Sequence, residues 1–236
     1  MIGIPKVFHI SWKDKNVANS EALMIQRGLH QLIALHPDWD VQISEDQDLD
    51  DYLIEKLEPR LFDLIKDEGP VQKTDIWRLL KLYYEGGVYV DLDRWCNKSL
   101  NDILTDDVQC ILPTNEDCDF SHDLMITAPY NPLFENTINL YLNRRLQGHT
   151  NTYLLGAQTY MHGVSIGLMH KMFDTNPGRN AFEDIRARID ELPEIATYRE
   201  ELPNNTLLFE GDASDWEAVK REFYAESGIK HWTGEW

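Results

Sequence analysis

The segment from Gln72 to Asp93 constrains the fold of this chain more than any other. Its first part repeats apolar residues at helical spacing and so predicts a helix with one buried face, formed by Ile76, Leu79, Leu80, Tyr83 and Tyr84. Gly86 and Gly87 end that helix, where a left-handed backbone is cheap only for glycine. Val88 to Asp93 then alternates with the period of a strand. The segment therefore predicts a helix, a glycine turn and a buried strand in succession.

Two carboxylates leave the same face at the end of this strand. Tyr89, Asp91 and Asp93 alternate with apolar residues, so they share one side, and strand rise puts the two Asp Cα atoms about 7 Å apart. Two neighbouring buried anions need a compensating cation or hydrogen-bond donors. Paired hard oxygen ligands suit Mg²⁺ or Mn²⁺ that also binds a substrate phosphate. The alternative for an isolated D-x-D sequence is a solvated strand end.

Asp75 and Arg78 lie one helical turn apart on the predicted helix, away from the centre of its apolar stripe. One interpretation is a surface ion pair worth less than about 1 kcal/mol. The other is functional: an arginine directed at a phosphate and an aspartate directed at a ribose hydroxyl.

The rest of the chain alternates short apolar strands with helices, which predicts an α/β fold with a largely parallel sheet. Its 236 residues suit one domain. Sheets of this kind bind ligands beyond the carboxyl ends of their strands. The predicted strands are 6–12, 39–44, 88–93, 108–112, 124–127 and 206–209, and the other predicted helices are 20–35, 50–57, 60–67, 132–146, 182–192 and 215–225.

Composition narrows the possible partners. With 22 Lys and Arg against 41 Asp and Glu, the formal net charge is −19, so the chain should repel nucleic acid and anionic membrane surfaces. Three cysteines without a CxxC pair support neither a disulfide framework nor a structural zinc site. The sequence shows no transmembrane segment and no signal peptide, which favours a cytoplasmic protein.

Three motifs in order along the chain resemble the DXD sugar transferases of glycosyltransferase family 32, which include fungal initiating α-1,6-mannosyltransferases and are related to the glucosylating clostridial toxins. The motifs are the opening IPKVFHISW of residues 4–12, the block KTDIWRLLKLYYEGGVYVDLD of residues 73–93, and the terminal HWTGEW of residues 231–236. The chain departs from the family in lacking a T-GP turn. Its nearest stretch is LLGAQT at residues 154–159, which weakens any transfer of acceptor-side residues.

The resemblance implies roles for individual residues. Asp93 would ligate a Mn²⁺ or Mg²⁺ ion directly, and Asp91 would reach the ribose or sugar and the metal through water. Asp75 and Arg78 would hold the donor sugar or its phosphates. The remaining donor-binding candidates are Trp12 near the nucleotide base, Tyr89 on the carboxylate face, His231 at the diphosphate or the metal, and Trp236 closing over the donor. His9, on the first strand, is expected to be structural.

The resemblance also implies a GT-A fold, with a Rossmann-like mixed sheet flanked by helices in a single domain of residues 1–236. Residues 1–113 would bind a UDP- or GDP-sugar donor, and residues 114–236 would form the acceptor side and the closing tail. Transfer would retain the anomeric configuration and would need no dedicated base. An inverting enzyme would need a carboxylate such as Glu116, Asp117 or Asp119 beside the acceptor. The expected acceptor is a glycan or glycoprotein, facing the polar loop 114–123, in a bacterial or virus-infected cell.

Two other functions remain open at this point. A metal-dependent phosphatase of the haloacid dehalogenase type also places D-x-D after an apolar strand. That class prefers Thr or Val two positions beyond the second Asp, where this chain has Trp95. The second alternative is a non-catalytic relative that binds a nucleotide sugar.

Overall fold

A computed structural model describes residues 3–17, 23–96, 98–114, 120–172, 195–199 and 209–210. The strands are β1 (Val7–Ser11), β2 (Asp40–Ser44), β3 (Gly87–Val90), β4 (Trp95–Cys96), β5 (Cys110–Thr114), β6 (Leu124–Thr127), β7 (Ile195–Arg199) and β8 (Phe209–Glu210). The α-helices are α1 (Leu23–Leu35), α2 (Asp46–Lys56), α3 (Pro59–Phe62), α4 (Pro70–Glu85), α5 (Pro132–Leu146), α6 (Thr152–Leu155) and α7 (Ala157–Met172), and a 3₁₀ turn spans Leu100–Asp102.

The main sheet has six strands in the order β2-β1-β3-β6-β5-β7. β1 pairs in parallel with β2 and β3, and β5 pairs in parallel with β7. β6 runs antiparallel to both β3 and β5, so among these strands it alone is reversed. The expected α/β fold with a mixed, largely parallel sheet is therefore confirmed. β3 lies between β1 and β6, and all its residues are buried, so the strand that leads to Asp91 lies inside the protein.

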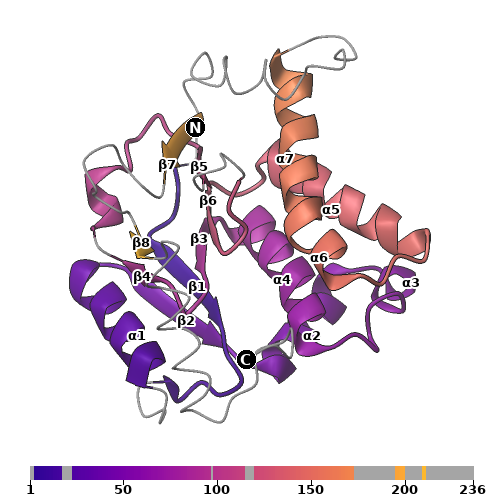
Figure 1. Ribbon diagram of the computed structural model, residues 1–236, viewed down its shortest axis with the longest axis horizontal. Helices are drawn as coiled ribbons and strands as arrows, with labels where there is room; N and C mark the ends of the chain where they lie inside the picture. Colours follow the sequence, from indigo (N-terminus) through magenta and orange to yellow (C-terminus); the bar gives the residue numbers. More distant parts are fainter. Residues whose placement is uncertain are drawn as a thin grey trace.

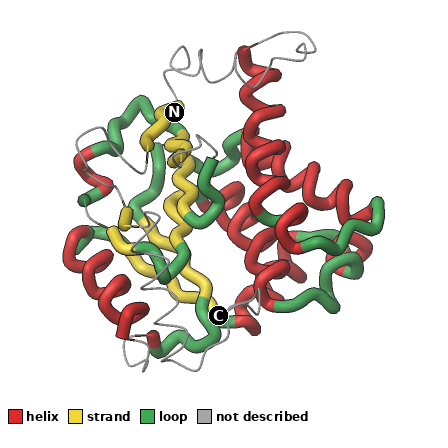
Figure 2. Tube along the Cα trace, in the orientation of Figure 1, coloured by secondary structure: helices red, strands yellow, loops and turns green. Residues whose placement is uncertain are grey.

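Helices cover both faces of the sheet (Figures 1 and 2). Val88 and Val90 of β3 pack with α1 and the 3₁₀ turn in one apolar core. Tyr89 points the opposite way, into a second core that α2, α4, α5 and α7 share. The alternation expected for residues 88–93 thus separates the two cores, and Asp91 follows Tyr89 on the side of α4. The strand predicted over 91–93 is wrong: the ladder with β6 stops at Val90, and Asp91 to Arg94 form a turn.

The glycine turn between α4 and β3 needs both of its glycines. Gly86 and Gly87 have φ angles of 68° and 98°. A Cβ on Gly86 would lie 2.6 Å from Pro129, and one on Gly87 would lie 2.6 Å from Val7. His9 Nε2 lies 2.9 Å from the carbonyl oxygen of Gly86, so the imidazole secures this turn, in line with the structural role expected for it.

The structure differs from the predictions mainly in the helical half. The predicted helix over 60–67 is only a short helix over 59–62 followed by turns, and α6 and α7 were not predicted. Gly163 and Gly167 weaken the helical signal of α7, yet they lie against Thr137 and Leu133 of α5, where a Cβ would meet atoms within 2.6 Å. Close helix packing therefore selects glycines that local propensity disfavours. The predicted helices over 182–192 and 215–225, and residues 206–208 of the predicted last strand, lie outside the described residues.

Candidate functional site

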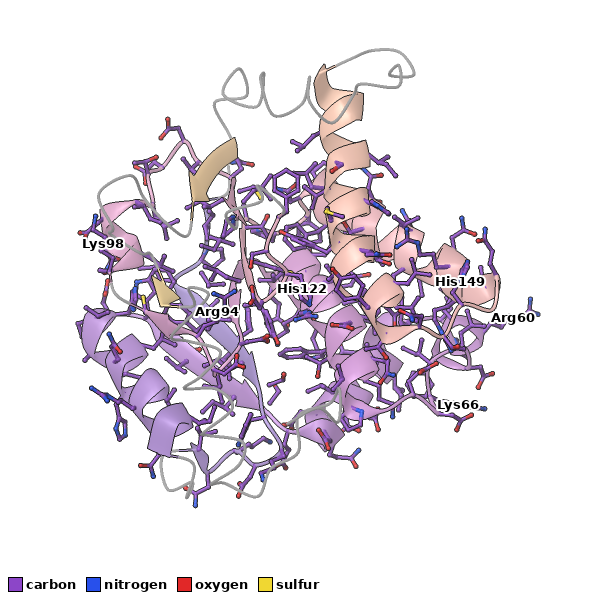
Figure 3. All side chains as sticks on the ribbon, in the orientation of Figure 1. Arg60, Lys66, Arg94, Lys98, His122 and His149 are labelled. Carbon is purple, nitrogen blue, oxygen red and sulfur yellow. The ribbon has the colours of Figure 1, made fainter. Side chains whose placement is uncertain are left out.

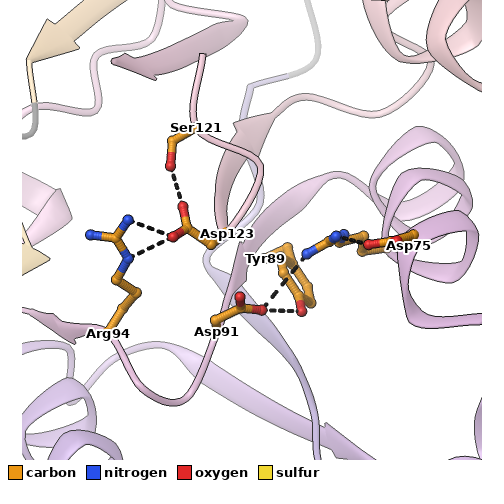
Figure 4. Close-up of polar contacts among 7 residues, drawn as sticks. Asp75, Tyr89, Asp91, Arg94, Ser121 and Asp123 are labelled. Carbon is orange, nitrogen blue, oxygen red and sulfur yellow. Dashed lines mark hydrogen bonds and ion pairs between the residues drawn. The ribbon is translucent and has the colours of Figure 1, made fainter. Parts of the chain in front are cut away.

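The Asp75–Arg78 pair of α4 is buried, which excludes the surface ion pair. Asp75 is 5% exposed and Arg78 is 4% exposed, and the Arg78 guanidinium donates a hydrogen bond to the Asp75 carboxylate. A charged pair removed from water costs free energy, so its presence here needs a reason beyond stability. Figure 4 shows Asp75 beside α4, on the side of that helix that faces Tyr89 and Asp91.

Arg78 joins this pair to the first carboxylate of the DXD sequence. Its Nη1 lies 3.7 Å from Asp91 Oδ1, and its guanidinium carbon lies 5.1 Å from the centre of the Tyr89 ring. The Tyr89 hydroxyl donates a hydrogen bond to Asp91 (Figure 4). Four residues that the sequence singled out, Asp75, Arg78, Tyr89 and Asp91, therefore form one connected polar group.

Asp91 is crowded by protein yet accessible, since 36% of its side-chain surface remains exposed. Burial raises the pKa of this carboxyl to about 6, Arg78 opposes the rise, and the charges of Asp93 and Asp123 add to it. Asp93 lies two residues further along the same turn and is half-buried. The end of β3 is thus a place where negative charges repel one another and a bound cation would relieve the repulsion.

The charges of this group fit a divalent cation. Asp75, Asp91, Asp93 and Asp123 meet two guanidinium groups, those of Arg78 and Arg94, which leaves a formal charge of −2. Carboxylate oxygens are the ligands that Mg²⁺ and Mn²⁺ prefer. Within the described part of the chain, no three His, Cys, Asp or Glu side chains form a complete metal-binding cluster. Mg²⁺ is commonly bound through one or two carboxylates and completes its shell with water and substrate phosphate, so the Asp91 and Asp93 carboxylates fit such an ion.

Asp123 and Arg94 are site residues that the sequence analysis did not identify. Arg94 Nε donates to Asp123 Oδ2 over 2.7 Å, Arg94 Nη2 donates to the same oxygen, and the Ser121 hydroxyl donates to Oδ1 (Figure 4). Burial by itself raises the pKa of Asp123, but the charge of Arg94 and the hydrogen bonds from Ser121 and Arg94 outweigh burial and lower it. Antiparallel β6 brings Ser121 and Asp123 to Asp91 and Arg94, and sequence spacing alone carries no signal of that pairing.

His122 lies near the centre of the molecule, between the sheet and the helical half (Figure 3). Burial lowers its pKa to about 4, and the nearby positive charges of Arg78 and Arg94 add to this effect. The imidazole is therefore neutral at physiological pH. Together with Ser121 and Asp123 it ends the polar loop that the sequence analysis placed on the acceptor side, so that the end of this loop lies beside the carboxylates.

Of the other predicted site residues, the structure describes Trp12 but not His231 or Trp236. Trp12 lies at the end of β1, is half-buried, and donates its backbone N–H to Ser44 over 2.9 Å. It packs against the α1-side core, and its place beside a nucleotide base stays a prediction. His231, Trp236 and residues 115–119 of the loop lie outside the described residues, so their roles also remain predictions.

Gly156, the residue between α6 and α7, lies directly against Asp75. A Cβ at this position would be 2.6 Å from Asp75 Oδ2. We expect Gly156→Ala to push the buried carboxylate away from Arg78, to reduce the free energy of unfolding by about 1–3 kcal/mol, and to weaken donor binding. Chemical denaturation and the KM for the donor would measure the two effects.

Gly167→Ala is the matched control, because its Cβ would meet a Leu133 methyl group at the same 2.6 Å, in the α5–α7 contact. It should lower stability similarly and leave the donor KM unchanged. Equal KM values for both variants would show that Gly156 has no special relation to Asp75.

A comparison with protein-family models matches residues 24–109 to the glycosyltransferase sugar-binding region containing the DXD motif. This range includes Asp75, Arg78, Tyr89 and both DXD carboxylates, which are the residues that the fold brings together. Over these residues the chain is similar to the DXD glycosyltransferases. The resemblance inferred from the sequence motifs is thereby confirmed.

Two curated relatives of this chain are yeast enzymes. A mannosyl phosphorylinositol ceramide synthase of Saccharomyces cerevisiae is 29% identical over 136 residues, which is 57% of this chain and 34% of that enzyme. Inositol phosphoceramide mannosyltransferase 2 of Schizosaccharomyces pombe is 29% identical over 159 residues, which is 67% of this chain and 43% of that enzyme. The matched segments thus span less than half the length of these relatives.

Among solved structures, the PaToxG glycosyltransferase has a similar fold. It superposes with a TM-score of 0.56 at 18% sequence identity, over 97% of this chain and 88% of that chain. At this identity the likeness concerns the fold alone, and it supports the GT-A architecture.

Two expectations are wrong. The relatives are fungal, which contradicts the expected cytoplasmic protein of bacterial or viral origin. Their names specify an inositol phosphoceramide, which is a lipid. This contradicts the expectation that the acceptor is a glycan or glycoprotein and that no membrane is involved. Both expectations used the net charge of the chain and the lack of a transmembrane segment and a signal peptide. These features do not predict the acceptor, because a lipid acceptor is held in the bilayer by its own apolar tail. In the described residues, no helix combines the length and apolarity that a membrane span requires.

Proposed function

We propose that this chain is a metal-dependent mannosyltransferase. It transfers mannose from a UDP- or GDP-linked donor to the inositol phosphate headgroup of a ceramide lipid, with retention of the anomeric configuration. The named activity of the yeast relatives supports the sugar and the acceptor. The observation that carries the proposal is the buried Arg78, which links Asp75 on α4 to Asp91 at the end of β3.

Each residue of this group has a task in the proposed reaction. Arg78 holds the donor and stabilises negative charge that grows on the departing diphosphate. Asp75 fixes the orientation of that guanidinium and accepts a hydrogen bond from a hydroxyl group of the donor. Tyr89 holds the Asp91 carboxylate through its hydroxyl group.

Asp93 and Asp91 would hold Mn²⁺ or Mg²⁺, with His231 as a further candidate ligand. The ion would supply neutralisation of the donor diphosphate, which a chain of net charge −19 otherwise repels. Residues 1–113 then form most of the donor side. Ser121, His122 and Asp123 extend it from the second part of the chain.

An assay of the purified chain tests this proposal. UDP-mannose and GDP-mannose are each incubated with inositol phosphoceramide in detergent micelles, with Mn²⁺ or with EDTA, and products are identified by mass spectrometry. We expect a mannosylated lipid in the presence of Mn²⁺ and little product in EDTA.

The same experiment separates the alternatives. Hydrolysis of p-nitrophenyl phosphate without any nucleotide-sugar turnover would instead identify a phosphatase. Mn²⁺-dependent thermal stabilisation by a nucleotide sugar, without turnover, would indicate a non-catalytic binding protein.

A further inference from the structure

The turn that carries the second DXD carboxylate lies beyond the sheet. The ladder between β3 and β6 ends at the pair Val90 and Leu124, and Asp91 to Arg94 follow as a turn closed by a 3.0 Å hydrogen bond from Arg94 N–H to the Asp91 carbonyl. The regular strand pairing therefore does not position Asp93, and the site needs another means of holding this turn.

Asp123 contacts both ends of the turn. Its backbone carbonyl accepts the Asp91 N–H over 2.9 Å, and its carboxylate accepts two N–H groups of Arg94 on one oxygen. The Ser121 hydroxyl donates to the other oxygen. Arg94 is 14% exposed and Asp123 is 21% exposed, so solvent screens this pair less than it screens an ion pair at the surface.

We infer that the Arg94–Asp123 pair positions the DXD turn for the metal, and that Arg94 strengthens cation binding although it is itself a cation. The inference rests on the proposed function, because it assumes a divalent ion at Asp91 and Asp93. Hydrogen-bonded partners of metal ligands commonly contribute 10–100-fold to metal affinity by orienting the ligands. Here the partner acts through the backbone of the turn on either side of Asp93.

The decisive variant is Arg94→Gln, because two physical effects oppose each other there. Removing a positive charge close to the ion should tighten Mn²⁺ binding by Coulomb's law alone. Releasing the turn should weaken it. We expect weaker binding, by about tenfold or more, measured without donor or turnover from the electron paramagnetic resonance signal of free Mn²⁺ during titration.

Asp123→Asn should weaken Mn²⁺ binding as well, and the Asp123→Asn/Arg94→Gln double variant should bind no more weakly than the weaker single variant, because both changes break one contact. Arg145→Gln is the matched control. Arg145 is 10% exposed and pairs with Glu68 in the helical half, so its loss should leave Mn²⁺ affinity unchanged.

Unchanged or tighter Mn²⁺ binding by Arg94→Gln would overturn the inference. If Arg94→Gln bound Mn²⁺ more tightly while Asp123→Asn bound it more weakly, Asp123 would itself be a metal ligand, and Arg94 would compete with the ion for its carboxylate. If the wild-type chain bound no Mn²⁺, with or without a nucleotide diphosphate, the proposed function would fail and this inference with it. The wild-type titration therefore separates the two failures.

Discussion

Replacing Asp93 by asparagine is expected to reduce Mn²⁺-dependent sugar transfer by about 10²–10³-fold while the chain remains folded. A direct metal ligand supplies several kcal/mol of charge stabilisation in the transition state, and each 1.36 kcal/mol corresponds to a factor of ten in rate. The metal-free variant should be at least as stable as the wild type, because the charge of Asp93 contributes to raising the pKa of Asp91. Initial rates at saturating donor and thermal unfolding in EDTA would measure the two quantities.

Asp106→Asn serves as the control, since Asp106 is an exposed carboxylate. It should retain wild-type rates. Retention of more than a third of the wild-type rate by Asp93→Asn would contradict the assignment of the metal to the DXD turn. A large loss of stability in EDTA would instead assign Asp93 a structural role.

Replacing Arg78 by methionine is expected to lower the free energy of unfolding by about 3–5 kcal/mol. The change leaves the carboxylate of Asp75 buried without its charged partner, and a lone buried charge costs far more than a broken surface pair. Transfer activity should be lost in the same variant, because Arg78 is proposed to stabilise the leaving diphosphate. Denaturant unfolding monitored by tryptophan fluorescence would give the stability.

Two further variants make this prediction specific. Asp75→Asn/Arg78→Met should recover part of the stability, since no unpaired charge remains, but not the activity. Lys66→Met breaks a pair with Asp63 at the same i,i+3 spacing, and both of those side chains are about half exposed, so the loss there should stay below about 1 kcal/mol. Similar losses for Lys66→Met and Arg78→Met would show that burial of the Asp75–Arg78 pair has little energetic consequence.

Local patterns sufficed for the part of the fold that forms the donor side. The helix stripe, the glycine pair and the alternation of Val88 to Asp93 each depend on residues a few positions apart, so the sequence predicted α4 and the start of β3 closely. It extended the strand three residues too far, because the alternation continues into the turn that follows Val90. Local spacing did not reveal that Asp75 and Arg78 are buried. Asp75 lies against Gly156, some eighty positions further along the chain between α6 and α7, and the glycines of α7 concealed that helix.

The amino-acid order alone determined which residue types meet at the end of β3, because helix and strand periods place Asp75 with Arg78 and Tyr89 with Asp91. Only the tertiary structure decided that Asp123 and Arg94 join them, since antiparallel pairing of β6 with β3 connects residues about thirty positions apart. The same long-range packing turned an ordinary i,i+3 ion pair into a buried one. Periodicity specifies the face on which a side chain leaves its own element, whereas the neighbour on that face depends on strand order, which no local pattern encodes.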